Sequence, residues 1–494
     1  MSASLLSQAG VKGDNDDVSV RISEKAEFEG FISALGVAHF LGVHFARILA
    51  RLGQAQLLPP ESHCATVDAT EYGPICPQAP DNLRSIRQHL FAGAPAANLA
   101  QSEYDCLRLN IYAPKSVISS RNKVPVLVWV HGGGWSIENG NADFSGDFLV
   151  HHSIETGKPI VFVSINYRMG SFGFLSSSEL AAEAVSHGEA GWANQGLNGQ
   201  RIGLQLVKDY IHIFGGDGSN VTIAGESAGA WSVLAHLRSN QALCQRGIMQ
   251  SAPSWSMLRP EEAQGKFDRL VQRAGIPLTA TASQRIAALR TASTEDLIAW
   301  NGPLTSPIWD PKWFVGLALP EAPLDCVEPF PNWVQAIVTG PMRDEMSVFG
   351  FDKLWQTKVS VISSLRNVLS LPSDLSFGSE SDEEEGSLLN GAAFHTLDNT
   401  YLCRYPAVAG SAAPRSCQTT ADMFSQMVLR HTYGEPPWQA YGISHAQNVF
   451  DGAYTRLETV SHDCQRWRKL LTSQDRTNKF ARLFFYFINQ GPGQ

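Results

Sequence analysis

Runs of apolar, often β-branched residues alternate along the chain with segments whose apolar residues recur at helical spacing. The clearest run is 124–130, Val-Pro-Val-Leu-Val-Trp-Val, and similar runs occupy 159–166, 220–224, 247–251 and 335–340. Uninterrupted apolar runs of this length are typical of parallel strands that are buried on both faces. The alternation with helical segments therefore predicts an α/β fold with a central, mainly parallel sheet flanked by helices.

The helical segments are marked by apolar spacing and by glycine. Leu204, Val207, Ile211 and Phe214 recur at the period of a helix, and Gly215-Gly216 follows them as a stop signal. A long, mostly helical stretch then separates the strands predicted at 247–251 and 335–340. We expect a large helical insertion there.

The order of these elements predicts the domain organisation. We expect one domain over residues 1–494, with a helical insertion at about 255–330 and an acidic loop at about 373–388. The acidic run Ser379–Glu385 is more typical of a solvated surface loop than of a regulatory docking segment. Internal repeats are absent from the sequence.

Composition and charge exclude some classes of protein. The 494 residues are 44% hydrophobic and 17% charged, an ordinary globular balance, and the net charge of −9 argues against a nucleic-acid partner. The longest apolar stretch, 31–46, contains two histidines and is too short to span a membrane. Without a recognisable signal peptide, the expected location is cytoplasmic, or secreted if a leader has been removed. As assembly we expect a monomer or a homodimer.

The eight cysteines are sparse for a disulfide scaffold, and none forms a C-x-x-C metal pattern. We therefore expect mostly free, buried thiols and no metal site. If any pair is bridged, Cys76 with Cys106 is the best candidate.

The motif that points to chemistry is Gly225-Glu226-Ser227-Ala228-Gly229. The buried strand predicted at 220–224 precedes it, and the segment 230–237, which contains no helix breaker, comes after it. A serine on a sharp turn from strand to helix is a nucleophile elbow, in which glycines permit the close passage of strand and helix. Taken alone, G-x-S-x-G is a common match, but in this context it makes Ser227 a candidate nucleophile.

A serine nucleophile in acyl transfer also needs donors for the developing oxyanion. His131-Gly132-Gly133-Gly134-Trp135 comes directly after the strand predicted at 124–130. Consecutive glycines let backbone N–H groups point into a cavity, and the amide of Ala228 would add to them. An ordinary flexible glycine turn is the competing interpretation.

The sequence also offers an acid and a base. Glu345 comes after the strand predicted at 335–340, where open α/β sheets place their chemistry, but the adjacent Asp344 has the same spacing. His445 comes later in the chain, with only His462 beyond it. The order serine, carboxylate, histidine is the order of an α/β-hydrolase.

In these motifs the chain resembles the type-B carboxylesterase/lipase family, which includes the cholinesterases and fungal ester lipases. The resemblance covers most of the chain, and its motifs occur in the family's order. The matching stretches are 40–43, 72–78, 105–112, the glycine run after His131, 166–168, 214–217, the Ser227 elbow, 250–252, Asp344-Glu345 and His445.

The resemblance implies a serine ester hydrolase without cofactor, acting on a small-molecule ester. It implies Ser227 as nucleophile, Glu345 rather than Asp344 as the triad acid, and His445 as the base. It further implies an oxyanion hole formed by the amides of Gly133, Gly134 and Ala228. A Cys76–Cys106 disulfide would match one that is common in secreted members.

The chain departs from the family pattern at several positions. Met346 replaces the glycine that is usual after the triad acid, and Gly199 replaces an aspartate. Residues 446–448 replace the usual Gly-x-Glu after the histidine, so a second acidic residue that often faces Glu226 is missing. These changes leave the catalytic groups in place and alter their surroundings.

Aromatic residues near the motifs suggest a hydrophobic substrate pocket, although core packing is an equal alternative for each of them. With Glu226, the pocket candidates are Trp135, Trp231, Trp255, Trp309, Trp313 and Phe314. Two other functions use the same sequence features. One is an acyltransferase or lactone-processing enzyme with the same triad, and the other is a catalytically silent binding module.

Overall fold

The computed structural model describes thirteen parts of the chain. They are residues 12–24, 26–63, 65–79, 100–118, 120–189, 193–252, 257–301, 305–310, 313–314, 330–340, 397–437, 446–451 and 454–459.

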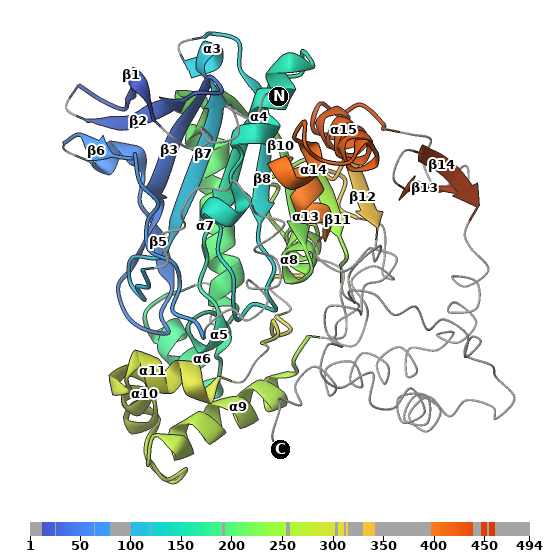
Figure 1. Cartoon of the computed structure of the whole chain (residues 1–494). Helices are drawn as coiled ribbons and strands as arrows, with labels where there is room; N and C mark the ends of the chain where they lie inside the picture. The colour runs from blue at the N-terminus through green and yellow to red at the C-terminus, as the bar shows by residue number, and fades with distance from the viewer. Residues whose placement is uncertain are drawn as a thin grey trace, which may run out of the picture.

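A mixed sheet forms the centre of the described residues (Figure 1). Its order is β1-β2-β3-β7-β9-β8-β10-β11-β12, and β6 pairs with β2 at the side. The strands of this sheet are β1 (Lys12–Arg21), β2 (Glu27–Ser33), β3 (Val37–His44), β6 (Val67–Asp68), β7 (Arg108–Pro114), β8 (Val124–Val130), β9 (Val161–Ile165), β10 (Gly216–Glu226), β11 (Arg246–Gln250) and β12 (Ala336–Gly340). Two smaller sheets pair β4 (Ala46–Ile48) with β5 (Ala55–Leu57), and β13 (Ala446–Asp451) with β14 (Tyr454–Thr459).

The half of the sheet from β9 to β12 is parallel, as the apolar runs predict. Every residue of β8 and of β9 is buried, which explains why their sequences are uninterrupted apolar runs. Pro125 lacks an N–H for the ladder, and the pairing of β8 with β10 shifts register around it, between Val124 and Val126. The predicted α/β architecture is confirmed.

The other half is antiparallel, which the apolar runs do not predict. β1 to β2, β2 to β3, β3 to β7 and β7 to β9 all pair antiparallel. Most of the apolar stretch 31–46 forms part of this half, in β2 and β3, and its last residue begins β4 of a smaller sheet. The sheet is therefore mixed, with an antiparallel half added to the predicted parallel one.

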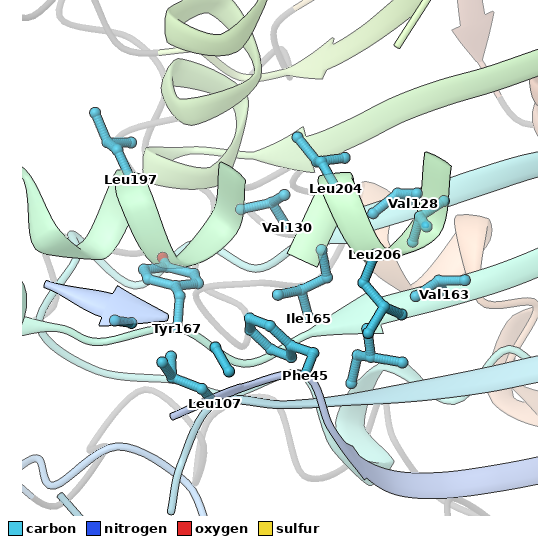
Figure 2. Close-up of a cluster of buried hydrophobic side chains, with 14 of the residues drawn as sticks. Phe45, Leu107, Val128, Val130, Val163, Ile165, Tyr167, Leu197, Leu204 and Leu206 are labelled. Atoms are coloured by element: carbon cyan, nitrogen blue, oxygen red, sulfur yellow. The ribbon is translucent and has the colours of Figure 1, made fainter. Parts of the chain in front are cut away.

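Successive side chains of the parallel strands enter two separate cores. Val128 and Val130 of β8 belong to a core with α7 (Gln195–Tyr210) and α8 (Ala228–Leu237). Figure 2 shows part of it, with Leu197, Leu204 and Leu206 of α7 close to strand residues such as Val130 and Ile165.

Trp129 belongs to the core on the opposite face, with α4 (Asp147–Glu155), α13 (Leu397–Leu402) and α15 (Arg415–Thr432). The alternation along β8 thus buries the strand between two helical layers.

The helix predicted around Leu204 is α7. It continues into the 3₁₀ turn η3 (Ile211–Phe214), which ends at Gly215 with φ of 90°. This left-handed residue confirms the predicted glycine stop. The remaining short elements are η1 (Pro60–Ser62), α3 (Lys115–Ile118), η2 (Ala142–Phe144), α5 (Gly170–Phe174), α6 (Ser178–Ser186) and α14 (Pro406–Ala409).

Within the region expected to be a helical insertion, the structure has α9 (Pro260–Arg273), α10 (Ala282–Thr291) and α11 (Thr294–Trp300). The side chains of Thr281 and Ser293 cap α10 and α11, because each accepts a hydrogen bond from a first-turn amide. These helices lie at one end of the sheet, together with α5 and α6 (Figure 1). The acidic loop predicted at about 373–388 lies outside the described residues.

No helix in the described ranges is both long and apolar enough to cross a membrane.

Candidate active site

Ser227 lies on a strained turn between β10 and α8. Its φ and ψ are 53° and −122°, a conformation that a non-glycine residue adopts only at a cost of about 1–3 kcal/mol. The Ser227 amide donates to the Gln250 carbonyl at 3.0 Å, and the Ser227 carbonyl accepts the first helical bond, from Trp231, at 3.0 Å. The strand-to-helix turn that the sequence predicts at Ser227 is present in the structure.

The two glycines of the motif are required by close backbone approach. A Cβ on Gly225 would lie 2.5 Å from the Gly229 carbonyl carbon, and one on Gly229 would lie 2.1 Å from the Val130 carbonyl oxygen. Neither contact is possible without moving the backbone. Glycine on both sides of Ser227 therefore lets α8 pass close to the end of β8.

The glycine run after His131 forms a compact loop beside the elbow. Gly133 and Gly134 have φ of 77° and 59°. The Gly133 carbonyl accepts from the amides of Ser136 and Ile137 at 3.0 and 3.1 Å. A Cβ on Gly133 would lie 2.2 Å from the Ile137 carbonyl oxygen. The loop is a defined turn rather than a flexible glycine linker.

Tyr167 fixes the start of this loop. Its ring stacks on His131 with centroids 4.3 Å apart, and its hydroxyl donates to the His131 carbonyl at 2.9 Å. Burial raises the pKa of Tyr167 well above its usual value, so the hydroxyl stays protonated and able to donate. Tyr167 is not among the residues predicted for the site, although its position directly after a buried strand is a usable signal.

The candidate oxyanion donors lie on these two adjoining elements. Ala228 is the first residue of α8, and the first amides of a helix have no partner inside the helix. The N-terminal end of α8 also carries the positive end of its dipole, which favours a negative charge beside Ser227. The arrangement suits stabilisation of an oxyanion.

Glu226 lies against the same loop. It is completely buried. A Cβ on Gly132 would lie 2.9 Å from both the Glu226 backbone oxygen and its Oε2, and 3.3 Å from the Ser227 Cβ. The carboxyl group of Glu226 therefore adjoins the turn that carries the candidate nucleophile.

Four of the predicted pocket aromatics, Trp135, Trp231, Trp313 and Phe314, are buried in the core behind the elbow. The Trp135 and Trp231 rings meet edge to face at 5.5 Å. The Trp135 Nε1 donates to Ser232 Oγ of α8 at 3.0 Å. Trp309 is partly buried against the same core. These contacts are those of core packing, and a role in a substrate pocket stays a prediction.

Other predicted site residues fall outside the described residues. They are Glu345 and its neighbour Asp344, His445, and Trp255. Their roles stay predictions from the sequence.

The predicted Cys76–Cys106 disulfide is not present in the structure. Both residues are free, buried thiols. The Cys76 sulfur accepts from the Met169 amide at 3.2 Å, and the Cys106 thiol lies 3.6 Å from the Glu103 carbonyl oxygen. A hydrogen bond with Cys76 and burial raise the pKa of Cys106 well above its usual value, which keeps it a thiol. This corrects the pairing and agrees with the expectation of buried, free cysteines.

No group of three or more His, Cys, Asp or Glu side chains within the described ranges is placed to hold a metal ion. A surface hollow of about 580 Å³ lies at the edge of β1, where Val20, Tyr210 and His212 line it. Because none of the predicted site residues lines this hollow, it is not a candidate for the active site.

Comparison with known proteins identifies the family. The model of the carboxylesterase family matches residues 17–430. Secreted lipase 1 of Botryotinia fuckeliana is 31% identical over 443 residues, which are 81% of this chain and 73% of the relative. Acetylcholinesterase of Bungarus fasciatus is 30% identical over 477 residues, which are 87% of this chain and 71% of the relative.

The fold has matching solved structures. A thermophilic PNB esterase superposes with a TM-score of 0.71 at 23% identity, covering 92% of this chain and 99% of the other. This likeness confirms the α/β-hydrolase fold. Since the family model matches most of the chain and includes the elbow and the glycine loop, the chain belongs to the carboxylesterase family and is a carboxylic ester hydrolase.

Proposed function

We propose that this chain hydrolyses a hydrophobic carboxylic ester through an acyl-enzyme on Ser227, with His445 as the base and Glu345 as its orienting acid. The strained turn of Ser227 at the N-terminus of α8 is the observation that carries the proposal. The choice of His445 and Glu345 rests on their order in the chain and on the family resemblance.

In the first half-reaction His445 accepts the proton of the Ser227 hydroxyl while the oxygen attacks the ester carbonyl. The tetrahedral intermediate then collapses, and His445 returns the proton to the departing alcohol. In the second half-reaction His445 removes a proton from water, which attacks the acyl-enzyme. The acid is released and Ser227 regains its proton. This route requires neither a metal ion nor an organic cofactor.

The amides of Gly133, Gly134 and Ala228 would hold the oxyanion of both intermediates. The positive φ of both glycines and the helix start at Ala228 support this role. Removal of one such donor typically costs about 3 kcal/mol of transition-state stabilisation.

Nitrophenyl esters of graded acyl length test the proposal and define the acyl group. We expect turnover by the wild type and its loss in Ser227→Ala and His445→Ala. Full esterase activity in Ser227→Ala would refute the mechanism.

Two matched variants test which carboxylate is the triad acid. Glu345→Gln should reduce kcat by orders of magnitude, because the imidazole loses the group that orients it, whereas Asp344→Asn keeps most activity. The reverse pattern would assign the acid to Asp344.

A further inference from the structure

Residues 305–310 form a segment that is anchored on both sides. The amide of Leu258, just before α9, donates to the Pro307 carbonyl at 2.9 Å. On the other side, the Asn194 side chain donates to the Ile308 carbonyl and accepts from the Ile308 amide, both at 2.7 Å. The segment is thus tied to the residues that precede α9 and to the start of α7.

Thr305, at the beginning of this segment, contacts the glycine loop. Its amide donates to the Gly134 carbonyl at 3.2 Å, and the same carbonyl accepts from Ser136 Oγ at 3.3 Å. Lys266 of α9 donates from Nζ to Thr305 Oγ1 at 3.1 Å. Thr305 is 3% exposed, and its hydroxyl also donates to Asn301 Oδ1 at 3.4 Å. A chain of two hydrogen bonds therefore runs from α9 to Gly134.

The Lys266 ammonium is held without a carboxylate partner among the described residues. Asp268 of α9 pairs with Arg285. Glu179, which accepts from Gln264 of α9, pairs with Arg285 as well. Burial lowers the pKa of Lys266 to about 8, and the charge of Arg269 acts in the same direction. Lys266 is partly buried, and a cation that gives up part of its water for a neutral acceptor is unfavourable for folding. Such a cost is commonly retained where the group serves function.

The glycine loop needs anchors of this kind. Gly133 and Gly134 have no side chains with which to hold their own amides in place. A shift of about 1 Å in a catalytic group can reduce a rate by about 100-fold. The carbonyl of Gly134 is one of the points at which surrounding residues hold the loop.

We propose that Lys266 and Thr305 are positioning residues of the oxyanion hole: the ammonium orients Thr305, and the Thr305 amide holds the Gly134 carbonyl, in the peptide next to the one that carries the Gly134 amide. The inference rests on the proposed oxyanion role of the Gly133 and Gly134 amides. It assigns to α9 a part in the rate of ester hydrolysis, although α9 lies outside the elbow and the loop.

Two variants remove the hydrogen bond between Lys266 and Thr305, one from each side. Lys266→Met removes the ammonium and keeps the apolar stem, and Thr305→Val removes the hydroxyl and keeps the amide. Each should lower kcat for a nitrophenyl ester by about tenfold, with KM changed by less than about twofold, because donor alignment counts mainly in the transition state. Thr305→Ser should keep wild-type kcat. Lys208→Met removes an exposed lysine that bonds the Ala242 carbonyl and serves as the matched lysine control.

The pH profile separates positioning from simple structural support. As pH rises through about 8, Lys266 loses its proton, so wild-type kcat should fall on the alkaline side. This fall should be absent in Lys266→Met. Arg269 is exposed and is the charged group whose field reaches Lys266, so Arg269→Gln should move the fall to higher pH.

The outcomes distinguish this inference from the proposed function. The positioning role alone would be overturned by one set of results. In it, Lys266→Met and Thr305→Val both keep the wild-type kcat and the wild-type fall of kcat at alkaline pH, while Ser227→Ala still loses turnover. Full activity in Ser227→Ala would overturn both. If Lys266→Met does not fold, as judged by its thermal midpoint, Thr305→Val and Arg269→Gln decide the question with the same readouts.

Discussion

Two neighbouring strands of the parallel half of the sheet each end before a serine with a positive φ, but the two serines have different surroundings. β10 ends before Ser227 and β11 ends before Ser251, and the φ values of the two serines are 53° and 51°. Each serine amide continues the ladder, Ser227 to the Gln250 carbonyl and Ser251 to the Gly340 carbonyl. Strain at the end of a strand is therefore common to both serines.

The surroundings of the two serines differ in exposure and in the element that comes next. Ser227 is partly exposed, begins α8, and is flanked by Gly225 and Gly229, which let the helix cross β8. Ser251 is 6% exposed, and its hydroxyl has no hydrogen-bond partner among the described residues. The helix N-terminus and the exposure of its side chain thus distinguish Ser227 from Ser251, and both features suit the proposed nucleophile.

The largest expected effect is on the rate of ester hydrolysis, when Ser227 at the end of β10 is replaced. Ser227→Ala should lower kcat by about 10⁴- to 10⁶-fold, because nucleophile and base act as a unit. Steady-state assays with a nitrophenyl ester measure this loss. A thermal midpoint close to that of the wild type shows that the fold is intact.

The next largest effect is on stability, and it differs between a glycine near the end of β10 and a glycine in β11. Gly229→Ala should destabilise the fold by about 3 kcal/mol, because its Cβ would meet a backbone oxygen of β8 that cannot move independently. Gly247→Ala in β11 should cost about 1 kcal/mol, since its Cβ would meet the Leu237 side chain, at 2.6 Å, which can rotate. Urea unfolding measures both free energies, and equal costs would contradict this explanation.

A smaller effect concerns the support of α8 one turn beyond Ser227. Ser232→Ala removes the acceptor of the Trp135 Nε1–H and should destabilise the fold by about 1 kcal/mol. Trp135→Phe in the Ser232→Ala background should then add less than it does in the wild type. Additive losses in this double-mutant cycle would show that the bond contributes nothing.

The smallest effect is expected at the end of β11. Ser251→Ala removes a buried hydroxyl that makes no hydrogen bond within the described residues, so stability should change by no more than about 0.5 kcal/mol. Its kcat should stay within about tenfold of the wild type. A loss comparable to that of Ser227→Ala would mean that the two strand ends are functionally equivalent.

The parallel half of the sheet and the elbow can be predicted from the sequence, because both depend on local signals. The apolar run 124–130 forms β8 with the same bounds, and glycine spacing identifies Ser227. The antiparallel half is not evident from the sequence because β1, with Lys-Gly-Asp-Asn-Asp-Asp at its start, lacks the apolar run of a buried strand.

Other features depend on contacts between distant parts of the chain. Nothing in the sequence near Lys266 indicates that it reaches Thr305, or that Thr305 bonds Gly134. The positive φ of Ser251 likewise has no signal in composition. Trp135 and Trp231 could equally line a pocket or fill a core from sequence alone, and only tertiary packing shows that they are buried.

The central claim is that Ser227 alone, of the two strained serines, is the nucleophile. Labelling the intact protein with a fluorophosphonate and mapping the adduct by peptide mass spectrometry tests it most directly. The account predicts a single adduct on Ser227, kept in Ser251→Ala and lost in Ser227→Ala. An adduct on Ser251, or labelling that persists in Ser227→Ala, would contradict it.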